Sequence, residues 1–167
     1  STTKLMNGLV HVVNCSQLPK AEFISSDTGL CGGSCISFVS MALNATGWQW
    51  LFPGATPASS TVESPTSVCY SNPGNYSVTL IVSNTAGTDT LQMVNFIQVN
   101  ANPAAPSFSQ NGDTLTSSPA SAYQWYFNGV PISGATSQQF VATLSGNYSV
   151  SITDGKGCSS TSPSRYV

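Results

Sequence analysis

The clearest pattern along the chain is an alternation of large apolar and polar residues in four segments. In the first half, residues 47–54 and 74–84 place a large side chain at every second position. A similar tryptophan segment and a similar tyrosine segment return in the same order at 123–129 and 146–152. A period of two is typical of strands with one buried face. The side chains expected in the resulting cores are Trp48, Trp50, Phe52, Tyr76, Val78, Leu80, Trp125, Phe127, Tyr148 and Val150.

Shorter apolar runs, bounded by turn residues, predict further strands at 20–26, 35–39, 68–70 and 91–99. No segment has the 3.6-residue periodicity of an amphipathic helix. Short strands at regular spacing predict an all-β protein. Because the tryptophan and tyrosine segments occur twice, we expect two tandem antiparallel β-sandwiches.

A proline-containing segment divides the chain. Residues 100–106 hold two prolines and predict a short, stiff linker. The expected domains are a β-sandwich at 15–99 and a smaller β-sandwich at 107–167. Residues 1–14 are interpreted as an N-terminal strand or the tail of a preceding segment, because the β-favouring run 9–13 has no obvious partner nearby.

These segments resemble two known families. Residues 21–23, 48–54, 74–80 and 84–90 resemble a PKD domain, an Ig-like sandwich. Residues 123–129, 132–136 and 146–154 are similar to short bacterial Ig-like domains. The resemblance implies a place in tandem arrays of large secreted bacterial surface proteins and hydrolases, with an accessory or structural role and no catalysis.

Five cysteines make an odd number, so at least one is free or bonded to another chain. Neighbouring strands favour a Cys35–Cys69 bridge, and Cys15 and Cys31 precede the first two strands, which favours a bridge between them. The other pairings of these four stay open. Domains similar to the second often carry a cysteine in an early strand; residues 113–115 have none, so Cys158 is expected to be unpaired or intermolecular.

The amino-acid composition limits the kinds of partner that the chain could bind. Charged residues make up 6% of the chain and the net charge is −2, which excludes a basic nucleic-acid surface. No apolar stretch approaches the roughly 20 residues that cross a bilayer. Five cysteines together with abundant hydroxyl and amide side chains predict a secreted or cell-surface location.

Catalysis, metal binding and cofactors are not expected. His11 is the sole histidine, and the six acidic residues are scattered over strands and turns. Many PKD domains carry Gly-Asp-Gly where this chain has Pro53-Gly54-Ala55, which removes a carboxylate that calcium would use. The spacing of Cys31 and Cys35 suits zinc, but a closed zinc site needs four ligands.

The sequence therefore predicts a non-catalytic, extracellular structural or adhesion module of a secreted or cell-surface bacterial protein. One alternative is an accessory module that attaches a secreted hydrolase to a polysaccharide or a fibrous protein, for which Tyr126 is the candidate exposed aromatic. Another is a subunit of a self-assembling filament in which the N-terminal run donates a strand to the next copy. The expected partners are accordingly protein or polysaccharide surfaces, or copies of the chain itself.

Overall fold

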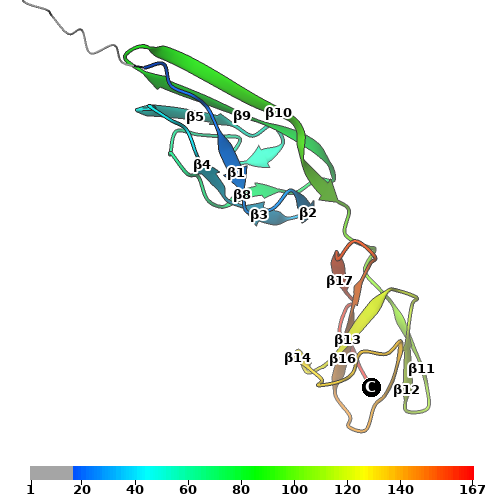
Figure 1. Cartoon of the computed structure of the whole chain (residues 1–167). Helices are drawn as coiled ribbons and strands as arrows, with labels where there is room; N and C mark the ends of the chain where they lie inside the picture. Colours follow the sequence, from blue (N-terminus) through cyan, green and yellow to red (C-terminus); the bar gives the residue numbers. More distant parts are fainter. Residues whose placement is uncertain (1–16) are drawn as a thin grey trace, which may run out of the picture.

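The computed structural model describes residues 17–167, which form two β-sandwiches one after the other along the chain (Figure 1). The predicted N-terminal strand at 9–13, His11 and Cys15 lie outside the described residues. The strands of the first sandwich are β1 (Phe23–Ser25), β2 (Gly29–Cys31), β3 (Ser34–Ile36), β4 (Phe38–Ser40), β5 (Gly47–Leu51), β6 (Ala55–Thr56), β7 (Ser59–Ser60), β8 (Val68–Tyr70), β9 (Gly74–Asn84) and β10 (Gly87–Asn100).

The larger sheet of the first sandwich has the strand order β2-β10-β9-β5-β7. The long hairpin β9–β10 runs along one side, and β1, β4, β8 and β3 lie across from it (Figure 1). These strands belong to two smaller sheets, β1-β4 and β3-β8-β6. The pairs are antiparallel, as expected, except that β2 pairs with the end of β10 in parallel. This exception brings the end of β2 to the point where the chain leaves the sandwich.

The strand expected at 35–39 is two strands in two different sheets. β3 pairs with β8, whereas β4 pairs with β1. Ile36 and Phe38 are both buried, so the alternation of side chains continues across the break. The Phe38 amide donates to the Pro65 carbonyl at 2.8 Å, a loop contact that separates the two strands. A period of two in the sequence predicts which side chains are buried, but it does not predict which strand pairs with which.

Trp50 is fully buried at the centre of the first core. The centroid of its ring system lies 5.2 Å from the Phe23 ring centroid, in an edge-on contact. It lies 5.7 Å from the Phe52 ring centroid, in a stacked contact. Its indole N–H donates to the Val62 carbonyl at 3.0 Å, which satisfies the one polar atom that burial would otherwise leave unpaired.

The second sandwich repeats this plan at smaller scale. Its strands are β11 (Phe108–Asn111), β12 (Thr114–Ser117), β13 (Ala122–Phe127), β14 (Val130–Pro131), β15 (Gln139–Val141), β16 (Asn147–Thr153), β17 (Ser159–Thr161) and β18 (Arg165–Tyr166). The sheet β11-β12-β15 faces the sheet β14-β13-β16-β17, and β18 also pairs with β16. Trp125 is fully buried and donates to the Ser137 carbonyl at 2.9 Å. Like Trp50, it bonds to a carbonyl twelve residues further along the chain.

Most of the side chains expected in the cores are buried. Three are only partly buried and pack against the edges of the cores: Trp48, Tyr76 and Phe127. The Trp48 indole N–H reaches the Ser40 hydroxyl at 3.1 Å, so this ring covers the core from its margin. Those with at most 2% exposure are Trp50, Phe52, Val78, Leu80, Trp125, Tyr148 and Val150.

Candidate functional site: the junction between the sandwiches

A disulfide joins the two sandwiches. Cys31, at the end of β2, is bonded to Cys158, in the turn that follows β16, with a Cα–Cα distance of 5.5 Å. Two expectations were therefore wrong: Cys31 does not pair with Cys15, and Cys158 is not unpaired. The reason lies in the parallel pairing of β2 with β10, which sets Cys31 opposite Asn100, the last strand residue before the linker.

Hydrogen bonds hold the linker on both sides of this disulfide. On the first sandwich, the Gly32 amide donates to the Asn100 carbonyl and the Asn102 side-chain amide donates to the Gly32 carbonyl, each at 3.0 Å. On the second, the Ser160 hydroxyl donates to the Pro103 carbonyl at 2.6 Å. The linker is thus hydrogen-bonded to each sandwich, and its two prolines stiffen it between them.

Gly32 lies where β2 closely approaches the neighbouring loop. A Cβ atom on Gly32 would lie 3.0 Å from the Ser71 carbonyl oxygen, which is backbone and cannot turn aside. A side chain here would therefore push the Cys31 end of β2 away from the neighbouring loop.

The turn 154–158 positions Cys158. The Asp154 carboxylate accepts hydrogen bonds from the Lys156 amide at 2.8 Å and the Cys158 amide at 2.9 Å. The Asp154 amide donates to the Cys158 carbonyl at 2.9 Å, and Gly157 adopts a φ of 85°, which favours glycine. Cys158 is fully buried, so the turn delivers its sulfur into the junction and away from solvent.

A second aspartate organises the approach to Cys31. The Asp27 carboxylate accepts from the Thr28 amide at 2.6 Å and the Gly29 amide at 3.0 Å, at the residue where β2 begins. Hydrogen bonds from the Gly29 and Thr28 amides lower the pKa of Asp27, because they stabilise the ionised carboxylate. By contrast, the Asp89 carboxylate accepts a hydrogen bond from the distant Ala21 amide at 2.8 Å.

The other disulfide lies within the first sandwich. Cys35 and Cys69 face each other in the register of β3 and β8 and are bonded, the pair that the sequence favours. All four cysteines in residues 17–167 are therefore in disulfides, and the odd cysteine of the sequence is Cys15.

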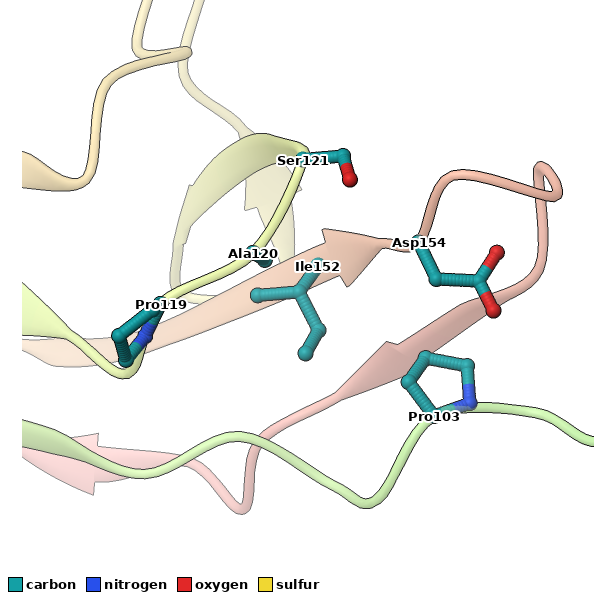
Figure 2. Close-up of a pocket in the computed structure, with 6 residues that line it drawn as sticks. All are labelled: Pro103, Pro119, Ala120, Ser121, Ile152 and Asp154. Carbon is teal, nitrogen blue, oxygen red and sulfur yellow. The ribbon is translucent and has the colours of Figure 1, made fainter.

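A pocket of about 370 Å³ lies beside the junction. Figure 2 shows Ile152 between the Ser121 hydroxyl and the Pro103 ring, with the Asp154 carboxylate at one end. One oxygen of that carboxylate already accepts the two amides of the turn. The pocket can accept a hydrogen bond and cover a small apolar group, but its hydroxyl has no adjacent base to activate it as a nucleophile. The lining residues are Pro103, Pro119, Ala120, Ser121, Ile152 and Asp154.

The described part of the chain also bears on metal binding and on membrane spanning. Among residues 17–167, no group of three or more His, Cys, Asp or Glu side chains is placed to hold a metal ion. The zinc spacing at Cys31 and Cys35 is accounted for, since each sulfur belongs to a different disulfide. Nor is any helix in that range long and apolar enough to cross a membrane.

Tyr126 is partly buried instead of freely exposed. It lies in β13 between two paired strands, opposite Pro131 of β14 and Ser149 of β16. Tyr126 is not among the residues of the second core, and the strand that flanks it could not be predicted.

One protein family matches most of the first sandwich. The PKD domain family matches residues 22–96. No curated protein matches the chain. The chain is 17% identical to the titin domains z1z2, solved in complex with telethonin, with a TM-score of 0.40, and the match covers 90% of this chain and 95% of that one.

Two further solved structures are similar to the chain at a low level. Carbohydrate-binding modules from the β-sandwich superfamily are 21% identical with a TM-score of 0.45, over 83% of this chain and 56% of theirs. A two-domain fibronectin type-III segment from chicken tenascin is 15% identical with a TM-score of 0.36, over 90% of this chain and 98% of that one. The chain is an all-β protein of two β-sandwiches, and residues 22–96 of the first match the PKD domain family.

Proposed function

We propose that this chain is a non-catalytic structural module, a spacer of two sandwiches, in a secreted or cell-surface bacterial protein. The observation that carries the proposal is the junction, where the Cys31–Cys158 bond and the hydrogen bonds of Gly32, Asn102 and Ser160 restrict movement of one sandwich against the other. Two flexibly linked domains would not need such a connection. A fixed joint suits a protein that must hold its ends apart.

Two further observations support this role. Disulfides persist in oxidising compartments, so the two bonds favour a location outside the cell. Within residues 17–167, the largest side chains are used in the two cores, and the pocket beside the junction lacks the paired groups that acid–base or nucleophilic catalysis requires.

Small-angle X-ray scattering tests the spacer role. We expect the wild-type protein to fit a single arrangement of the two sandwiches, and the variant Cys31→Ser/Cys158→Ser to give a broader distribution of distances. The matched control is Cys35→Ser/Cys69→Ser, which removes a bond inside the first sandwich and should leave the joint unchanged. A broad distribution for the wild-type protein would count against a fixed spacer.

An exposed apolar face favours self-assembly as a second candidate function. On the outer side of β1 and β4, Ile24 lies opposite Val39, and Met41 and Leu43 continue the same row. These four side chains are between 43% and 58% exposed. Contiguous apolar surface of this kind marks contact sites in many proteins.

In this second candidate, the chain is a filament subunit and the run 9–13 of a neighbouring copy is the donated strand. Light scattering over a range of concentrations tests it. Assembly should depend on residues 1–14 and should weaken in Ile24→Ser/Met41→Ser. A monomer at all concentrations, unchanged by deleting residues 1–14, would eliminate this candidate.

A further inference from the structure

We infer that the Cys31–Cys158 disulfide carries tension past the bulk of both sandwiches when the chain is pulled from its ends. This inference rests on the proposed structural role, since a spacer is a part that can be loaded. The disulfide connects residues 127 positions apart and so closes residues 32–157 into a loop. The continuous covalent path from Gln17 to Val167 then needs only two short segments, 17–31 and 158–167, and the bond between them.

The first of these segments already spans its sandwich from end to end. The Asn84 side-chain amide donates to the Gln17 carbonyl at 2.7 Å, which holds Gln17 at the turn of the β9–β10 hairpin. Cys31 lies opposite Asn100, at the other end of β10. Segment 17–31 therefore covers the length of a strand of 14 residues and has little slack to release.

The second segment spans the other sandwich in the same way. Cys158 lies at the junction, two residues before the Ser160 hydroxyl that binds the linker. At the other end of β16, Val167 exchanges two backbone hydrogen bonds of 2.9 and 3.0 Å with Gly146. Figure 1 shows β17 next to the linker and the C-terminus at the far end of the sandwich. Tension would therefore follow one nearly extended line through the molecule.

The consequence for extension is large. With the disulfide intact, segments 17–31 and 158–167 reach at most about 90 Å when fully extended. Without it, but with Cys35–Cys69 still closed, the chain from Gln17 to Val167 reaches about 400 Å. Most of both cores, including Trp50 and Trp125, lies in the loop that tension bypasses, whereas Ala21, Phe23 and Leu30 of the first core lie in the loaded segment 17–31.

Optical-tweezers measurements on the full chain, with handles at its two ends, test the inference. Every variant carries Cys15→Ser, so that no free thiol exchanges with the disulfides, and non-reducing peptide mapping first establishes that Cys31 is bonded to Cys158. The comparison is between this background, Cys31→Ser/Cys158→Ser and Cys35→Ser/Cys69→Ser. Lengths are compared as differences, so that residues 1–16 cancel.

We expect the background protein to show no unfolding steps beyond the short extension of the two end segments. Removal of Cys31–Cys158 should add roughly 300 Å of contour length in abrupt steps. The Cys35→Ser/Cys69→Ser control should behave as the background does, because its bond lies inside the bypassed loop. If Cys31→Ser/Cys158→Ser does not fold, dithiothreitol added to the stretched background protein should convert the short extension into one of at least about 400 Å, since it also reduces Cys35–Cys69.

Long unfolding steps in a protein whose Cys31–Cys158 bond has been mapped would overturn the inference. So would equal contour lengths before and after that bond is removed. Neither result bears on the scattering test of the spacer: a fixed joint with long steps rejects the bypass alone, whereas a broad distance distribution rejects the spacer.

Discussion

Tyr76 and Tyr148 make the same hydrogen bond in the two sandwiches. Each hydroxyl donates to the carbonyl four residues earlier in the chain, Tyr76 to Asn72 at 2.8 Å and Tyr148 to Leu144 at 2.9 Å. In immunoglobulin folds a tyrosine bonded in this manner fixes the corner through which the chain enters a core strand. The equivalence shows that the sequence repeat at 74–84 and 146–152 is also a repeat of structure.

The corner bond should contribute measurably to stability. Tyr148→Phe should lower the free energy of unfolding by about 1 kcal/mol, because the Leu144 carbonyl loses its partner. Tyr76 is more exposed than Tyr148, so water replaces part of the lost bond and Tyr76→Phe should cost less. Urea titration measures both. The control is Tyr126→Phe, since the Tyr126 hydroxyl makes no hydrogen bond among residues 17–167; an equal loss there would contradict the assignment.

The second sandwich should be the more easily unfolded by a core substitution. Leu115 is fully buried, and Leu115→Ala should cost about 2–5 kcal/mol, a large share of what a domain of this size has. Amide hydrogen exchange in β13 and β16 would then accelerate while β9 and β10 stay protected. Leu144→Ala is the matched control: Leu144 is 63% exposed, and its loss should change stability by less than about 0.5 kcal/mol.

Tyr70 should titrate at a higher pH than a free tyrosine. Burial, and then its neighbour Tyr76, raise the pKa of Tyr70 from the usual 10.0 to about 12. A folded-state pKa above that of the unfolded chain means that the neutral phenol favours folding. This contribution is complete below about pH 10 and is lost as the pH rises towards 12.

Ultraviolet absorbance of the phenolate form follows this titration. Tyr70→Phe should remove the rise in phenolate absorbance near pH 12. It should leave the free energy of unfolding at neutral pH unchanged or slightly higher, because the buried Tyr70 hydroxyl has no hydrogen-bond partner in the described structure. Destabilisation by more than about 1 kcal/mol would show that the hydroxyl is satisfied in solution.

The Asp154 turn should control formation of the disulfide between the sandwiches. Asp154→Ala removes the acceptor for the Lys156 and Cys158 amides, so oxidative refolding should yield less Cys31–Cys158 and more mispaired protein. Asp154→Asn keeps an oxygen at the same position and should restore most of the correct bond. Non-reducing peptide mapping measures the ratio; an Asn variant as defective as the Ala variant would point to the charge instead of the hydrogen bonds.

The architecture follows from the sequence to the extent that alternation determines it. Trp50 and Trp125 are in phase with their neighbours, and their burial requires strands with one covered face. The Cys35–Cys69 bridge is accessible to the same reasoning, because each cysteine is adjacent to a buried residue in its own strand.

The disulfide-linked junction could not be predicted from the alternation of apolar and polar residues. Its geometry depends on the parallel pairing of β2 with the last residues of β10, a contact between segments about seventy residues apart that leaves no periodic trace. One signal did exist: Cys158 has no partner cysteine within its own sandwich, and a bond to the other sandwich was the remaining arrangement within one chain. A prediction that treats each domain separately does not consider a disulfide between the two domains.

Only 6% of the side chains are charged, and residues 17–167 contain a single ion pair, Lys20 with Glu22 at 3.8 Å on the surface. Dissolved salt acts on proteins largely by screening such charges, and this surface is wetted through hydroxyl and amide groups instead. A module built in this way would keep the same stability and the same joint in fresh water and in sea water.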